Sequence, residues 1–207
     1  MKEIDYFENT DIMSSEKFFN NDGLLHHTTK PAFIAYYPDG SIDLVSWLIN
    51  GIEHREDAPS IIAYYPDGQI LGEMWHINGE VKNPDINLPF ALMYYSTGEI
   101  LNKSWVGDDL STRSSVITYY ESGNKMNEIW LNSDYEYFRI DNEPTMVEYY
   151  PDGELKTQSW IVGKYNGDIP LTYKQEGGGS YIDHRIEYDI DGVIVKNIFD
   201  FSIIKKL

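Results

Sequence analysis

The chain has 207 residues and a formal charge of −18, from 34 acidic and 16 basic side chains. This charge opposes direct binding to nucleic-acid phosphates or to anionic lipid. The absence of cysteine excludes a disulfide framework and thiol chemistry. No run of 18 apolar residues could span a membrane, and the first residues lack the apolar stretch of a signal peptide. We therefore expect a cytoplasmic protein, in a bacterium or in a host cell.

One phrase recurs along most of the sequence. It has a pair of tyrosines, a glycine four residues after the first tyrosine, and a tryptophan eleven residues after it. The first tyrosines are Tyr36, Tyr64, Tyr94, Tyr119 and Tyr149, and the tryptophans are Trp47, Trp75, Trp105, Trp130 and Trp160. A period of 25 to 30 residues is typical of a repeat protein. Because repeated aromatic residues usually pack unit on unit, we expect these ten to form the structural core of the repeats.

Residues 1–30 are a degenerate first unit that we expect to act as an N-terminal cap. Tyr6-Phe7 stands thirty residues before Tyr36-Tyr37, and Phe19 takes the place of the tryptophan because it precedes Gly23 by four residues. End units of repeat proteins commonly drift in this way. The one hint of a helical turn lies near residues 14–18.

Residues 31–58 show the structure of one unit most clearly. The β-branched and aromatic segment 33–37 predicts a strand. Pro38-Asp39-Gly40 predicts a three-residue hairpin loop, because Pro presets φ and Gly supplies a positive φ. Residues 41–49 return as the second strand, and Asn50-Gly51 is a strong signal for a two-residue turn.

The predicted loop also assigns side chains to the two faces of the hairpin. Side chains alternate along a strand, so we expect Tyr36, Ile34, Ile42 and Leu44 on one face. In the next unit we expect Tyr65, Glu73 and Trp75 on the opposite face. Neither face is fully polar, which predicts that one aromatic row is buried and the other half-covered.

The remaining units follow at 59–88, 89–113, 114–143 and 144–170, so that five hairpin repeats occupy residues 31–170. After Pro170 the pattern loosens: a glycine-rich turn at 176–180 joins predicted strands at 171–175 and 181–188, and Asp191-Gly192 returns in register. We expect residues 171–207 to be a modified last repeat or C-terminal cap. The predicted fold is all-β, an elongated antiparallel meander of six to seven β-hairpin units.

The phrase Tyr-Tyr-Pro-Asp-Gly, followed by a Trp and then Asn-Gly, resembles the divergent second variety of the MORN repeat. Residues 47–59 look like the long form of that repeat. Such repeats occur in bacterial proteins of the YwqK antitoxin type and in large DNA viruses. The resemblance covers residues 31–170 and implies repeated β-hairpins. It brings no catalytic residues with it.

Individual polar residues give little sign of catalysis or of a cofactor. The five histidines lack zinc-site spacing, and His26 and His54 hold equivalent repeat positions, which predicts a structural role in the connections. Asp39, Asp67 and Asp152 are turn residues, with a repeated calcium site as the alternative. The run 177–180 lacks the lysine of a phosphate-binding loop. We expect no enzyme, no metal and no cofactor.

The sequence therefore favours a non-enzymatic binding module with an acidic surface that holds another protein, possible forms being an inhibitor or antitoxin-type protein that covers a basic partner. A viral or structural scaffold and a small-ligand binder are the alternatives. Residues outside the repeated phrase are the better partner contacts, because a scaffold does not fix them. These are Glu73, His76, Asp108, Asp109, Glu136 and Arg139.

Overall fold

The computed structural model describes residues 1–85, 87–106, 114–139, 142–163 and 181–199. These residues form strands and turns and include no α-helix, which confirms the all-β meander of hairpins. The segment in which a helical turn was expected is instead part of strand β2, Met13–Phe18. The chain divides into two compact units, Met1–Ser104 and Trp105–Leu207.

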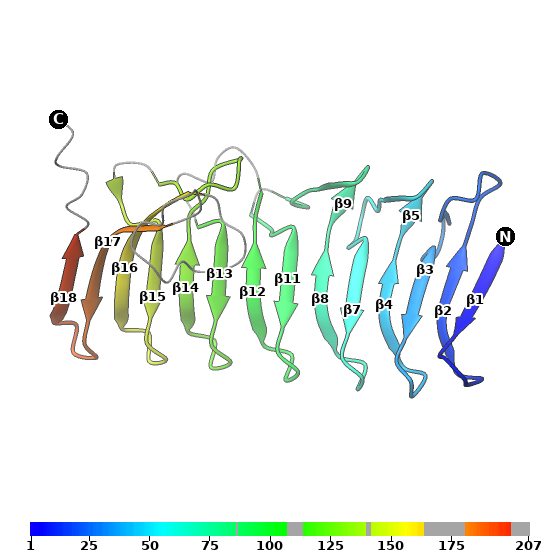
Figure 1. Cartoon of the computed structure of the whole chain (residues 1–207), viewed down its shortest axis with the longest axis horizontal. Helices are drawn as coiled ribbons and strands as arrows, with labels where there is room; N and C mark the ends of the chain where they lie inside the picture. The colour runs from blue at the N-terminus through cyan, green and yellow to red at the C-terminus, as the bar shows by residue number, and fades with distance from the viewer. Residues whose placement is uncertain (86, 107–113, 140–141, 164–180, 200–207) are drawn as a thin grey trace. The chain divides into compact units, whose positions relative to one another are not determined.

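The first unit carries eight main strands that lie side by side in chain order, each antiparallel to its neighbours (Figure 1). They are β1 Lys2–Tyr6, β2 Met13–Phe18, β3 Phe33–Tyr36, β4 Ile42–Ser46, β7 Ile61–Tyr64, β8 Ile70–Met74, β11 Ala91–Tyr94 and β12 Ile100–Ser104. Two short hairpins connect successive pairs: β5 Leu48–Ile49 with β6 Ile52–Glu53, and β9 His76–Ile77 with β10 Glu80–Val81.

The second unit repeats this arrangement with six described main strands, again antiparallel and in chain order. They are β13 Val116–Tyr119, β14 Lys125–Ile129, β15 Met146–Tyr149, β16 Leu155–Val162, β17 Tyr181–Tyr188 and β18 Ile194–Phe199. The predicted strand at 171–175 and the glycine-rich turn at 176–180 lie outside the described residues.

The hairpin turns have the predicted three-residue form. The Tyr37 N–H donates to the Ser41 carbonyl at 2.8 Å, and the Gly40 N–H donates to the Tyr37 carbonyl at 2.9 Å. The same pair of bonds closes the later hairpins, and Gly68 has the expected positive φ of 87°. We call the strand ends that carry these turns the turn side.

The opposite ends of the strands, where one hairpin passes to the next, form the connection side. In Met1–Ser104 the short strands β5 and β9 mark this side (Figure 1). Asn50 and Gly51 have φ of 51° and 81°, the two successive positive values that a two-residue type I′ turn requires. The predicted Asn-Gly turn is thus confirmed.

Each described main hairpin also contains a β-bulge next to its turn, in the strand that follows the turn. Ala35 pairs with Leu44 while Tyr36 pairs with Ile42, so Asp43, between Ile42 and Leu44, pairs with no residue of β3. An extra residue resets the alternation of side chains. The expectation that Leu44 shares the face of Tyr36 was therefore wrong.

The corresponding bulge in the β7–β8 hairpin changes the predicted face of Glu73. This residue pairs with Ile62, which lies two residues from Tyr64 on the same strand face. Glu73 consequently shares the face of Tyr64, where the sequence pattern had placed it with Tyr65. This position allows the hydrogen bond described below.

Full burial is confined to a small part of the described chain. In the second unit Ile129, Leu131, Tyr137, Met146 and Ile161 form a cluster with exposures of 1–7%. In the first unit the buried apolar residues are Ala32, Val45, Leu48 and Ala91. Neither predicted aromatic row is the buried one as a whole, because most of its members are half-buried.

Candidate functional site

Three of the five first tyrosines bond to an acid on the preceding hairpin. The Tyr36 hydroxyl donates to Glu16 Oε1 at 2.9 Å, and the Tyr94 hydroxyl donates to Glu73 Oε2 at 2.8 Å. Tyr149 donates to Glu128 Oε2 at 2.6 Å. Burial, reinforced by the neighbouring carboxylate, raises the pKa of Tyr36 to about 12. Glu73 is therefore held inside the repeat and is a poor partner contact.

The second tyrosines join each hairpin to the next through the backbone. The Tyr37 hydroxyl donates to the Tyr64 carbonyl and the Tyr65 hydroxyl donates to the Tyr94 carbonyl, both at 2.8 Å. Tyr120 and Tyr150 make the same bond at 2.9 Å, to the carbonyls of Tyr149 and Tyr188. These rows have a connecting function that their sequence spacing alone did not reveal.

Trp47, Trp75, Trp105 and Trp130 each follow directly after a main strand at the connection side, whereas Trp160 lies within β16. Trp130 is buried, with 6% exposure, whereas Trp47, Trp75, Trp105 and Trp160 are half-buried. The guanidinium carbon of Arg55 lies 3.8 Å from the Trp47 ring centroid, and that of Arg139 lies 3.9 Å from the Trp130 centroid. Such stacking is a cation–π interaction.

The two arginines make a second contact that fixes their position. Arg55 Nη1 donates to the Pro59 carbonyl at 3.1 Å, and Arg139 Nη1 donates to the Pro144 carbonyl at 3.2 Å. We call this arrangement of aromatic ring, arginine and proline carbonyl the arginine clasp. Arg139, predicted as a partner contact, is thus engaged within its own repeat. The spacing from Trp47 to Arg55 and Pro59 recurs with one or two extra residues at Trp130, Arg139 and Pro144, so it identifies the clasp only once the backbone bonds align the connections.

His76 is also less accessible than the sequence suggested. It is 9% exposed, and its Nδ1 lies 2.8 Å from the hydroxyl of buried Ser60. Burial lowers the pKa of His76 below its ordinary value, with Glu53 opposing the shift. Glu136 is exposed and bonds to Asn132. The predicted contacts Asp108 and Asp109 lie outside the described residues.

His26 and His54 have the structural role that their equivalent positions predicted. The backbone N–H of Asn50 donates to His26 Nδ1 at 3.1 Å, and that of Asn78 donates to His54 Nδ1 at 3.2 Å. Each bond ties the Asn-Gly turn of one hairpin to the connection before it. Because Nδ1 accepts, the ring proton of a neutral imidazole lies on Nε2.

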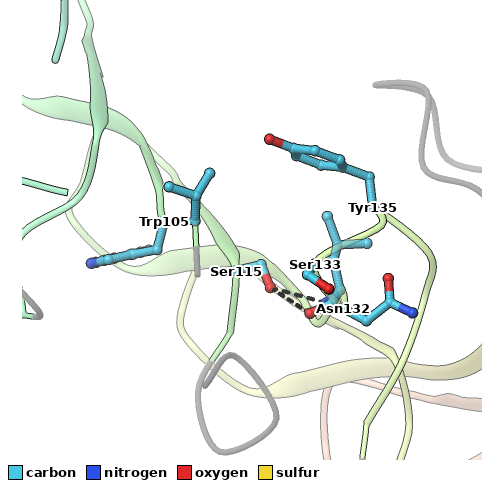
Figure 2. Close-up of a pocket in the computed structure, with 7 residues that line it drawn as sticks. Trp105, Ser115, Asn132, Ser133 and Tyr135 are labelled. Carbon is cyan, nitrogen blue, oxygen red and sulfur yellow. Dashed lines mark hydrogen bonds between the residues drawn. The ribbon is translucent and has the colours of Figure 1, made fainter. Parts of the chain in front are cut away.

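Described residues line hollows on the connection side of each unit, and three of these hollows bear on function. The smallest, in the second unit, has a volume of about 60 Å³ and is lined by Trp105, Ser115 and Tyr135 among others (Figure 2). Ser115 Oγ accepts from the Leu131 N–H at 2.9 Å and donates to its carbonyl at 3.3 Å. This space suits a few water molecules. It is too small for an organic ligand.

The two larger hollows lie in Met1–Ser104. One, of about 460 Å³, is lined by His27, Trp47, His54 and Arg55, with Glu56 and three polar residues beside them. The other, of about 370 Å³, is mostly apolar, and we call it the Trp75 groove. Its lining consists of Asp57, Ala58, Pro59, Trp75, Pro84, Leu88, Pro89 and Leu92.

No set of three or more His, Asp or Glu side chains is placed to hold a metal among the described residues. Nor does the described structure include a helix that could cross a membrane. No protein-family model and no curated protein matches the sequence. The geometry of the connection side is therefore the basis for inferring function.

Proposed function

We propose that this chain is a non-enzymatic binding module that holds a cationic segment of another protein on its connection side. The observation that carries the proposal is a group of exposed acids there: Glu56, Asp57 and Glu80. No cation pairs with them among the residues that the structure describes. Acidic side chains in this state attract and steer a positively charged partner.

The charge balance of the first unit supports this proposal. Residues 1–104 contain 16 acidic but only 6 basic side chains. Two of the six, Lys2 and Lys17, form ion pairs within the first hairpin, and Arg55 is occupied in its clasp. Little positive charge is left to balance the acids on the connection side. An inhibitor or antitoxin-type protein that covers a basic partner is the most concrete form of this function.

The test compares two triple variants with the same change in charge. Glu56→Gln, Asp57→Asn and Glu80→Gln neutralise the connection side, whereas Glu8→Gln, Glu99→Gln and Glu154→Gln neutralise exposed acids of the turn side. The partner is captured from lysate on the immobilised chain and identified. Its association and dissociation rates are then measured at about 0.01 M and about 0.15 M ionic strength, where the screening lengths differ several-fold.

The connection-side variant is expected to associate more slowly at low salt while its dissociation rate changes less. The turn-side variant should retain most of the association rate of the wild type. A captured partner that is acidic, or whose association ignores salt, would contradict the proposal. A passive spacer or assembly element would show neither the salt dependence nor the difference between variants.

Binding of a small molecule is the second candidate, and the hollow of about 460 Å³ favours it. Its volume is within the usual range of ligand pockets. The Nε2–H of His54 and the guanidinium of Arg55, which stacks on Trp47, are hydrogen-bond donors in its lining. Such a set would suit a planar ligand with acceptor oxygens. A screen of carboxylate-bearing metabolites by thermal shift tests this function separately.

A further inference from the structure

In three of the described units, the chain's own side chains cover the aromatic ring at the start of the connection. The ring residue is identified by a backbone bond from the connection to its carbonyl. Phe18, Trp47, Trp75 and Trp130 accept this bond from His26, His54, Lys82 and Phe138, at 2.8–3.1 Å. This pattern makes Phe18, rather than the predicted Phe19, the equivalent of the tryptophans.

The residue that follows each donor lies over the ring. His27 meets Phe18 edge-on with centroids 5.5 Å apart, and Arg55 stacks on Trp47. Arg139 stacks on Trp130 in the same way. A cation also reaches the first ring, because Lys30 Nζ lies 4.0 Å from the Phe18 centroid. Each of these three rings therefore has a positively charged side chain against it.

Trp75 departs from this rule. The residue after Lys82 is Asn83, too short and uncharged, and no cation stacks on Trp75 among the described residues. The carbonyl that would complete a clasp here is that of Pro89, because Trp75 bonds to Phe90 as Trp47 bonds to Ser60. No donor reaches the Pro89 carbonyl within the described structure.

The space that an arginine would fill in this unit is open. The Trp75 groove has a volume of about 370 Å³, and both Trp75 and Pro89 line it. Among the described residues of the lining, Asp57 is the one charged side chain, and it is exposed. A ring, an unpartnered carbonyl and a carboxylate thus occur together. These are the three kinds of group that bind a guanidinium.

We propose that the Trp75 groove receives an arginine side chain of the partner protein, which completes from outside the clasp that Arg55 and Arg139 complete from within. The guanidinium stacks on Trp75, donates to the Pro89 carbonyl and pairs with Asp57. This inference rests on the proposed function, since it assigns the anchor of the cationic partner. Arginine fits better than lysine, because only a planar guanidinium stacks and donates sideways at once.

The test uses the full chain labelled at its tryptophan indole nitrogens, observed by NMR. The probe is a capped Gly-Arg-Gly peptide, and the control is capped Gly-citrulline-Gly, which keeps the shape but lacks the charge. A single stacked guanidinium binds weakly, in roughly the 10–100 mM range. The Trp75 resonance is expected to shift progressively with the arginine peptide. The Trp47 and Trp130 resonances, whose rings already hold arginines, should shift much less.

Two reciprocal variants sharpen the test. Asn83→Arg supplies the missing arginine and should abolish the response of Trp75. Arg55→Asn removes the existing one and should create a response at Trp47, while leaving Trp75 responsive. An unmoved Trp75 resonance in the wild type would overturn the proposal. An equal shift with the citrulline peptide would also overturn it, because charge would then not be recognised.

This result can be separated from that of the rate measurements above. If Trp75 responds to the arginine peptide while the captured partner is acidic, the groove stands and the cationic-partner function fails. If association depends on salt while the Trp75 resonance does not shift with the arginine peptide, the cationic-partner function is supported and the groove is not the anchor of the partner. Asn83→Arg should also speed dissociation of the captured partner by at least several-fold, because desolvated anchors carry much of the binding energy.

Discussion

Residues in this chain take their roles from the neighbouring hairpin as much as from their own. Glu73 illustrates this, because its carboxylate accepts a hydrogen bond from the hydroxyl of Tyr94 in the next unit. The sequence could predict that Tyr94 belongs to the repeat but not that Glu73 faces it. A bulge shifts the register between the two strands by one residue, and no residue type in the repeat announces a bulge.

His76 provides a prediction on stability at this scale. Burial lowers its pKa, so the unfolded chain binds a proton near pH 6.5 while the folded chain does not. The contribution of His76 is complete above about pH 6.5 and is lost progressively as pH falls toward its lower folded pKa. We expect the unfolding free energy of the wild type, relative to His76→Asn, to decline as pH falls below about 6.5.

The comparison is made by urea unfolding at several pH values. Asparagine keeps a polar group near Ser60, so the variant serves as a non-titrating reference. His27, whose pKa burial also lowers, contributes equally to both proteins and cancels. Parallel pH profiles for the two proteins would show that His76 titrates alike in the folded and unfolded chain.

At the scale of the element, the turns were the part of the structure that the sequence predicted best. Pro, Asp and Gly at fixed places predicted the three-residue loops, and Asn-Gly predicted the type I′ turns, because each residue satisfies a local backbone need. The Asp39 carboxylate shows the mechanism, since it accepts the Ser41 N–H at 2.9 Å. Burial was harder to predict, because it depends on which neighbour covers a side chain.

Gly68 offers a test of the turn. Its φ is 87°, and a Cβ added there would meet no atom within 4 Å, so any cost comes from the backbone alone. Gly68→Val should lower the unfolding free energy by about 1–3 kcal/mol, because a branched side chain resists positive φ. Gly68→Asn should cost much less, since Asn adopts this region readily. Equal stability of the two variants in chemical unfolding would contradict the assigned turn.

The arginine clasp joins two elements and was not predicted. Trp47, Arg55 and Pro59 stand in the sequence at a spacing that recurs, with one or two extra residues, at Trp130, Arg139 and Pro144. Of the three kinds of clasp residue, only the tryptophans and prolines recur at regular positions of the repeat, whereas the arginines do not. The arginine is recognisable only when the connection is aligned by its backbone bonds, because the connections differ in length.

For the whole molecule, charge outweighs every other compositional feature. Acids exceed bases by 18, and every described ion pair involves at least one side chain more than a quarter exposed. Exposed pairs contribute little, whereas excess charge of one sign repels itself in the compact state. Repulsion should therefore dominate the effect of salt on stability.

We expect the midpoint of thermal unfolding to rise when ionic strength increases from about 0.01 M to about 0.15 M. Recovery of about 1 kcal/mol would raise it by about 2–4 °C for a chain of this size. The Glu8→Gln, Glu99→Gln and Glu154→Gln variant should respond less, since it carries less excess charge. A midpoint that falls with salt would mean that ion pairs, rather than repulsion, dominate.

The order of the strands has a consequence for how the chain reaches its structure. Within each unit every main strand pairs with the strand next to it in the chain, so the loops to be closed are short and their entropic cost is small. Local pairings of this kind form early and quickly. A hairpin at the N-terminal end has all its partners as soon as the following hairpin has left the ribosome. We therefore expect the chain to acquire its fold progressively during synthesis, with no need to wait for its last residues.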